Sequence, residues 1–219
     1  QGFSRRLQKN VDTIASIIDS SDINDEIKSR VNAVIKETIP KTLDFVFNNV
    51  SKMDILINGL LQISRTGRVI MNIKQIDMNE LIQNIVKSKD FQLAEIEANI
   101  NIEPLHDCFG DENLLNQLFS NIIANAINYR DENRKLEIII RSQNFFKKII
   151  FSISDNGIGI ADRHKSKVWD VFFRVNLQSS IGGEGLGLSI VKRIVDKHKG
   201  RIWLESTENQ GTTFYVELL

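Results

Sequence analysis

Several residue types are scarce in this 219-residue chain, and each scarcity excludes a class of protein. The single cysteine, Cys108, excludes an internal disulfide framework and suits a reducing compartment. Two prolines favour long helices over a loop-rich fold. The formal net charge is zero, so no global field attracts nucleic acid or a membrane surface. No apolar run reaches the roughly 18 residues that a membrane-spanning helix needs.

What is present indicates a folded protein. Apolar residues make up 42% of the chain, which is enough for a hydrophobic core and excludes global disorder. The length allows one large domain or two small ones. The sequence begins at Gln1 without a methionine or a signal-peptide pattern, and we expect it to be a fragment of a longer protein.

Residues 1–66 have the apolar periodicity of helices. Apolar side chains recur at three- and four-residue steps from Phe3, and Asp22 is a candidate N-cap for a second stretch. Pro40 marks a kink or a helix start, and the strongest periodicity follows it from Leu43 to Leu60. This broad stripe predicts a helical hairpin that forms half of a four-helix bundle, which homodimerisation would complete. The alternative is an intramolecular hairpin packed on the second domain.

Residues 67–219 alternate between strand and helix patterns after a predicted linker at Ser64–Arg68. The pattern predicts an α+β sandwich with a mostly antiparallel sheet. Its strands are expected at residues 71–76, 96–103, 136–142, 148–154, 201–205 and 212–218. Its helices are expected from Asp77, over 111–129, 162–169 and 184–199, with Gly200 as a C-terminal cap and a mobile loop over 175–183.

Two asparagines on the predicted helix 111–129 form the first candidate constellation. Asn121 and Asn125 are four residues apart and therefore share a helix face. Asparagine is a mediocre helix former, and its amide oxygen can ligate Mg²⁺ without adding charge beside phosphates. Taken alone, the pair fits two ordinary surface or loop-bonding asparagines better than a metal site.

Two glycine-containing turns form the second and third constellations. Asp155 ends a predicted strand and is followed by Gly157 and Gly159. Its carboxylate could accept a hydrogen bond from an exocyclic amine, and the glycines would let a ring approach the main chain. The run Gly182–Gly187 precedes a predicted helix, and glycine amides before a helix N-terminus can cradle an anion. Each pattern alone also fits a common turn or linker. The third matches neither the Walker A nor the dinucleotide-binding pattern.

Together, and in this order, the motifs resemble those of the ATP-binding domain of sensor histidine kinases, within the GHKL ATPase family. The resemblance covers roughly residues 70 to 219 and implies a Bergerat-type α/β sandwich. The segments that carry it are Asn121–Tyr129 (N box), Asp155–Gly159 (G1 box), Trp169–Arg174 (F box) and Gly183–Leu188 (G2 box). Residues 56–65 also resemble the end of the family's dimerisation hairpin.

The resemblance implies a Mg²⁺-ATP site and a role for each matching residue. Asn125 is the expected Mg²⁺ ligand with Asn121 in support, and Asp155 is expected to read the adenine amine. Gly157, Gly159 and Tyr129 would flank the base, and Arg174 or Arg130 could supply charge where Asn128 replaces the family's usual lysine. The remaining expected nucleotide contacts are the main-chain amides of Gly183, Gly185, Leu186 and Gly187.

The implied activity is histidine phosphorylation in a two-component system. The expected partners are a second copy of the chain and a response-regulator receiver domain, without nucleic-acid contact and without membrane contact by this fragment. The expected location is the cytoplasm, either as a cytoplasmic protein or as the cytoplasmic part of a membrane-bound sensor. The phosphoacceptor box is not found here, so we expect it before Gln1. We expect structural or solvated roles for His106, His164 and His198, the last favoured in its charged form by a helix dipole.

Three other functions remain as alternatives to a histidine kinase. An ATP-driven clamp of the same family would use a glutamate to activate water, but Gln117 stands near that place. A non-enzymatic docking module would have a degenerate nucleotide site, and a serine-directed kinase would lack the long N-terminal hairpin.

Overall fold

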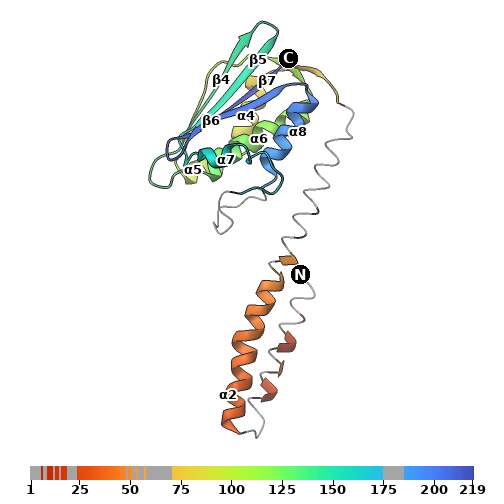
Figure 1. Cartoon of the computed structure of the whole chain (residues 1–219), viewed down its shortest axis with the longest axis vertical. Coiled ribbons are helices and arrows are strands. Elements are labelled where there is room, and N and C mark those ends of the chain that lie inside the picture. Colours follow the sequence, from red (N-terminus) through yellow and green to blue (C-terminus); the bar gives the residue numbers. More distant parts are fainter. Residues whose placement is uncertain are drawn as a thin grey trace. The chain divides into compact units, whose positions relative to one another are not determined.

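The computed structural model describes residues 6, 9–11, 13–14, 16–18, 24–47, 49–50, 53, 57, 71–174 and 185–219. The chain divides into two compact units, Gln1–Ile57 and Asn58–Leu219 (Figure 1). The linker predicted at 64–68, the domain boundary predicted at 66/67 and the loop predicted over 175–183 lie outside the described residues.

The described residues of the first unit are almost all helical, as predicted. Helix α2 (Asp25–Ala33) begins after Asn24, whose side chain accepts a hydrogen bond from the amide of Glu26 at 2.8 Å. Asn24 therefore caps this helix, whereas the predicted cap, Asp22, lies outside the described residues.

Pro40 lies inside a helix in this unit. The π-helical turn η1 (Val34–Thr38) directly follows α2, and helical residues continue from 39 to 47. Proline has no amide hydrogen, and its ring clashes with the carbonyl four residues earlier, which accounts for a widened turn immediately before it. Of the two predicted alternatives, a kink or a helix start at Pro40, the helix start is therefore wrong.

The second unit contains the predicted, mostly antiparallel sheet. Its strands lie in the order β2-β4-β5-β7-β6, and only the β2–β4 pair is parallel. A separate two-stranded sheet pairs β1 with β3. The strand bounds are β1 (Lys74–Ile76), β2 (Asn99–Ile102), β3 (Cys108–Gly110), β4 (Glu137–Phe145), β5 (Lys148–Asp155), β6 (Arg201–Thr207) and β7 (Gly211–Leu218).

Helices cover one face of this sheet (Figure 1). They are α4 (Met78–Lys87), α5 (Asp90–Glu95), α6 (Glu112–Asn128), α7 (Asp162–Lys165) and α8 (Gly187–Lys197). Alternate residues of β5 are buried, and the ring of Phe151 meets that of Phe119 on α6 edge to face at 5.5 Å. The predicted α+β sandwich is confirmed. Among the described residues, no helix is both long and apolar enough to cross a bilayer.

Local sequence signals predicted the helix starts at Asp77 and Asp111 correctly, but they predicted the short elements poorly. Asp77 and Asp111 both act as N-caps, as their patterns predict. The strands predicted at 71–76 and 96–103 are shorter than expected, and the helix predicted over 162–169 ends at Lys165. Strand β3 and helix α5 were not predicted at all, because each is too short to show a clear periodicity.

The predicted glycine cap at the end of α8 is wrong. Lys199, with a φ of 55°, takes the left-handed position that usually selects glycine. The amide of Gly200 donates to the carbonyl of Val195, which completes a Schellman motif. Gly200 is required for a different reason, since a Cβ there would lie 2.2 Å from the carbonyl oxygen of Glu217.

Candidate functional site

Helix α6 carries the two asparagines predicted to act together. Its N-cap, Asp111, accepts a hydrogen bond from the amide of Leu114 at 3.1 Å. Asn121 and Asn125 are half-buried one turn apart, beside the start of α8. The Asn121 amide donates to the carbonyl of Gly187 at 3.5 Å, and a Cβ on Gly187 would lie 3.9 Å from Asn125 Oδ1. The fold therefore brings the asparagine pair to the glycine-rich helix start.

Asp155 is a largely buried carboxylate at the end of β5. Its Oδ1 accepts hydrogen bonds from the amides of Gly157 at 2.9 Å and Thr212 at 3.3 Å. Burial raises the pKa of Asp155 to about 6, although both amide bonds act in the opposite direction. Within the described part of the chain, both bonds go to Oδ1, so Oδ2 can accept a hydrogen bond from a further donor.

The glycines after Asp155 allow close approaches within the protein's own backbone. A Cβ on Gly157 would lie 2.4 Å from the carbonyl oxygen of Tyr129, which accepts a hydrogen bond from the amide of Ile158. Gly159 has a φ of 66°, and a Cβ there would lie 2.0 Å from the Thr207 carbonyl oxygen. These close approaches place the turn against Tyr129 at the end of α6 and against Thr207 of β6. The approach of a ligand to these glycines stays a prediction.

Gly185 lies against the F-box segment. The amide of Phe172 donates to the carbonyl of Gly185 at 2.9 Å, and both residues have left-handed backbones, with φ values of 67° and 70°. A Cβ on Gly185 would lie 2.8 Å from the carbonyl carbon of Phe172. This contact brings together two segments that are predicted to flank the nucleotide.

Helix α8 begins at Gly187 rather than at the predicted Glu184. Leu186 is buried at the N-cap position, and no side chain among the described residues caps the helix. The first-turn amides of α8 therefore have no helical partner, and the positive end of the helix dipole lies beside Asn121. Gly183 and Glu184 lie outside the described residues.

Tyr129 and Arg174 occupy the ends of two site segments. Half-buried Tyr129 is the C-cap of α6, where its amide donates to the carbonyl of Asn125 at 2.9 Å. Arg174 is half-buried and ends the F-box segment; the next described residue is Gly185. The guanidinium of Arg130, a further candidate for charge near the site, donates to the carbonyl of Ile127.

His198 joins the end of α8 to the start of α6. Its Nε2 accepts a hydrogen bond from the amide of Asp111 at 3.0 Å, and Nδ1 lies 2.8 Å from the carbonyl oxygen of Ile194. This pairing fixes a neutral tautomer with the hydrogen on Nδ1. Burial lowers the pKa of His198, so the expected preference for its charged form is wrong. Burial outweighs the hydrogen bond to the Ile194 carbonyl and the charge of Asp111, both of which raise the pKa of His198.

The other histidines also have local partners. Exposed His106 lies with Nδ1 2.9 Å from the hydroxyl oxygen of Ser142. The ring of His164 packs against that of Phe173, with centroids 5.7 Å apart.

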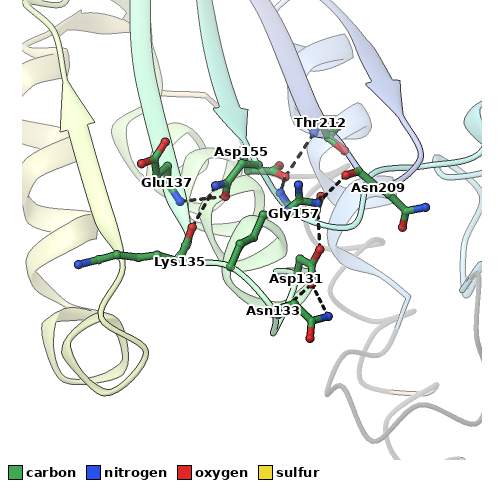
Figure 2. Close-up of polar contacts among 10 residues, drawn as sticks. Asp131, Asn133, Lys135, Glu137, Asp155, Gly157, Asn209 and Thr212 are labelled. Atoms are coloured by element: carbon green, nitrogen blue, oxygen red, sulfur yellow. Dashed lines mark hydrogen bonds and ion pairs between the residues drawn. The ribbon is translucent and has the colours of Figure 1, made fainter.

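Sequence reasoning missed the side chains that hold the turn after Asp155. Asn156 accepts a hydrogen bond from the amide of Glu137 and donates to the carbonyl of Lys135. Arg134 donates to the carbonyl of Gly157 (Figure 2). No motif identifies such contacts, because each joins a side chain to backbone that is distant in sequence.

The donor chemistry suits a metal that arrives with phosphates. Among the described residues, no group of three or more His, Cys, Asp or Glu side chains could hold a metal ion. Mg²⁺ accepts one or two protein oxygens together with phosphate oxygens and water. The amide oxygens of Asn121 and Asn125 fit such a nucleotide-borne cation.

Comparison with known proteins identifies the family. The model of the family described as "Histidine kinase-, DNA gyrase B-, and HSP90-like ATPase" matches residues 110–219. Cyanobacterial phytochrome B of Nostoc sp. is 37% identical over 169 residues, covering 76% of this chain and 22% of the phytochrome. Sensor protein kinase WalK of Staphylococcus epidermidis is 33% identical over 189 residues, covering 84% of this chain and 31% of the kinase. The chain thus spans less than a third of the length of either relative.

Solved structures agree with this assignment. The catalytic domain of the histidine kinase ThkA has a TM-score of 0.59 and 29% identity, covering 68% of this chain and 95% of that chain. The mycobacterial sensor histidine kinase MprB has a TM-score of 0.58 and 26% identity, covering 66% and 97%. The resemblance read from the sequence motifs is confirmed, and the chain belongs to the histidine kinase-, DNA gyrase B- and HSP90-like ATPase family, with sensor histidine kinases among its relatives.

Proposed function

We propose that this chain binds Mg²⁺-ATP around the C-terminal half of α6 and passes the γ-phosphoryl group to a histidine of a two-component sensor kinase. One observation carries the proposal. Three motifs that are far apart in sequence meet along this helix: Asn121 and Asn125 lie beside Gly187, and the turn after Asp155 lies against Tyr129.

Asp155 would recognise the adenine base. The carboxylate is held by two amides through Oδ1, so Oδ2 would accept the exocyclic amine of adenine. Tyr129, Gly157 and Gly159 would border the ring. The pKa of about 6 keeps Asp155 mostly ionised at pH 7, as an acceptor must be.

The start of α8 would hold the phosphates. Its uncapped amides, with those of Gly183, Gly185, Leu186 and Gly187, would donate to phosphate oxygens, and Arg174 would add charge. A helix end alone supplies only about 0.3–1 kcal/mol per nearby charge at an exposed site. A cation held by Asn125, with Asn121 in support, would therefore be needed to neutralise a triphosphate.

The chemical step would be an in-line phosphoryl transfer. The bond from the γ-phosphorus to the β,γ-bridging oxygen breaks, a phosphorus–nitrogen bond forms on the acceptor imidazole, and ADP leaves. The protein would contribute positioning and charge neutralisation. His106, His164 and His198 each contact other groups in the ATPase unit, which supports an acceptor on a dimerisation helix outside this chain.

The helical unit would supply a dimer. Several large apolar side chains in this unit are about half exposed or more, which favours burial against a second copy. They are Ile14, Ile17, Ile27, Val34, Phe45, Val46, Val50, Met53 and Ile57. A receiver domain of a response regulator would then take the phosphoryl group from the histidine, in the cytoplasm.

Calorimetric titration of the chain with ATP tests the site. Asp155→Asn should weaken ATP binding at least about tenfold, because part of the acceptor becomes a donor. Asn125→Ala should abolish the gain in affinity that Mg²⁺ gives. His106→Ala, at an exposed residue away from the proposed site, is the control and should bind as the unchanged chain does. ATP affinity that survives Asp155→Asn unchanged contradicts the base assignment.

An ATP-hydrolysing clamp is the second candidate function. Gln117 lies one turn before Asn121 on α6, where a water-activating glutamate would be needed. An amide is not a general base, which favours phosphoryl transfer over hydrolysis. Sustained release of inorganic phosphate from ATP by this chain would support the clamp instead.

A further inference from the structure

Arg134 ties together three segments around Asp155. This residue lies in the loop between α6 and β4, and its Nη2 donates to the carbonyl of Gly157 at 3.1 Å and to that of Asn209 at 2.6 Å. Figure 2 shows Gly157 and Asn209 next to Asp155. The same nitrogen lies 3.0 Å from a carboxylate oxygen of Asp131. One side chain therefore fastens the turn after Asp155 to the turn between β6 and β7.

The backbone of these turns is joined in the same place. The amide of Asn209 donates to the carbonyl of Ile158 at 2.7 Å, and the amide of Ile158 donates to that of Tyr129 at 3.0 Å. Arg134 adds the side-chain contact that joins the loop after α6 to both turns. The turn that begins at Gly157 is consequently held from two sides.

The orientation of Gly157 bears directly on Asp155. The amide of Gly157 donates to Asp155 Oδ1 at 2.9 Å, while its carbonyl accepts from Arg134 at 3.1 Å. If the carbonyl is released, the peptide between Gly157 and Ile158 is held, among the described residues, only by the bond from the Ile158 amide to the Tyr129 carbonyl. The glycine can then turn more easily, because no Cβ restricts its backbone. The amide bond that orients the Asp155 carboxylate would then weaken.

The ion pair with Asp131 contributes less to holding Arg134 in place than the hydrogen bonds to the two carbonyls do. Both side chains are partly exposed, at 36% for Arg134 and 22% for Asp131, and exposed pairs contribute little. Hydrogen bonds from a charged donor are stronger, and one of the two acceptors is the carbonyl of buried Gly157, while Asn209 is exposed. The two carbonyl contacts therefore determine what Arg134 does.

We infer that Arg134 is a positioning residue for base recognition: by holding the carbonyl of Gly157 against the β6–β7 turn, it keeps the Asp155 carboxylate aimed at the adenine amine. This inference rests on the proposed function. Guanine has a carbonyl oxygen where adenine has the amine, so a correctly aimed carboxylate favours ATP over GTP.

Calorimetric titration of the full chain with Mg²⁺-ATP and Mg²⁺-GTP tests the inference. Arg134→Ala should weaken ATP binding about tenfold and leave GTP binding within about twofold, so that the ATP preference falls about tenfold. Asp131→Ala removes the ion pair and the two hydrogen bonds that Asn133 donates to Asp131 Oδ1, but it leaves both carbonyl acceptors of Arg134 in place. It should therefore change the preference less than about twofold.

Arg141→Ala is the matched control. Arg141 is also a partly exposed arginine paired with a carboxylate, since its Nε lies 2.7 Å from an oxygen of Glu103, but it touches neither turn. The ATP preference should survive this substitution. A merely stabilising Arg134 would lower the affinities for ATP and GTP equally.

Arg134→Lys serves as a second test variant in case Arg134→Ala does not fold. Lysine keeps the charge and loses the planar guanidinium, so the ATP preference should fall by an intermediate factor, with the melting temperature recorded for each variant. An ATP preference unchanged in folded Arg134→Ala or Arg134→Lys overturns the inference. Absence of any ATP preference in the unchanged chain would instead overturn base recognition by Asp155, and with it the proposed function.

Discussion

The two units of this chain bury apolar side chains to very different extents. Among the described residues of the helical unit, only Val11 and Ile35 are buried hydrophobic residues. The second unit has one continuous core that connects α4, α6 and α8 to the sheet, with residues such as Phe119, Phe151 and Val216 almost fully buried. Equally helical segments thus differ in whether their apolar face is covered within one copy of the chain.

This difference teaches that helical periodicity alone does not indicate where a helix packs. The stripe on α6 is covered by β5 and α8, whereas Phe45, Val46 and Val50 remain exposed in a single chain. The second unit should therefore fold without a partner, and the first should depend on concentration.

The largest expected effect comes from the same substitution in the two units. Phe119→Ala removes a fully buried ring that contacts Phe151 edge to face and should lower the free energy of unfolding by about 3–5 kcal/mol. Phe45→Ala changes a side chain that is 70% exposed and should leave the unfolding of the second unit within about 0.5 kcal/mol. Urea denaturation followed by circular dichroism measures both, and equal losses would remove the distinction between the units.

The next largest expected effect is a pH dependence of the second unit's unfolding free energy, caused by Asp155. Burial raises the pKa of Asp155 from 3.8 to about 6, so the stabilisation of the folded state by its proton is complete below about pH 4 and is lost as the pH rises through 6. Relative to Asp155→Asn, the chain should lose about 2–3 kcal/mol of unfolding free energy between pH 4 and pH 7. Parallel denaturation series at these pH values test this, and a constant difference would exclude a raised pKa.

A charged side chain on the helical unit should break the proposed dimer. Phe45→Glu should raise the dimer dissociation constant roughly thirtyfold, about 2 kcal/mol, because a carboxylate would be buried at the interface. Phe91→Glu makes the same change at an 86%-exposed residue of the second unit and should leave the dimer intact. Sedimentation equilibrium distinguishes the two variants, and equal weakening would place the contact elsewhere.

The smallest effect concerns the end of α8. Lys199 has a φ of 55°, so Lys199→Gly should stabilise the second unit by up to about 1 kcal/mol. Gly200→Ala should destabilise it, because a Cβ there meets the Glu217 carbonyl oxygen at 2.2 Å. Thermal melting measures whether each variant raises or lowers the melting temperature. If Lys199→Gly lowered it and Gly200→Ala raised it, the assignment of the left-handed position to Lys199 would be contradicted.

The sequence predicted features that depend on neighbouring residues. Asp77 and Asp111 cap helices as expected, the strands predicted at 136–142 and 148–154 form the neighbours β4 and β5, and the order of the motifs gave the family correctly. Capping, periodicity and turn formation act over a few residues, so a local pattern contains the information needed to predict them.

Only the tertiary structure decided contacts between distant segments. It paired β1 with β3, gave the left-handed cap position to Lys199, and brought the Arg134 guanidinium to Gly157 and Asn209. These outcomes depend on which backbone groups lie within hydrogen-bonding distance after the sheet and helices pack. No local pattern fixes that, because the partner of each group is chosen by the packing of the whole unit.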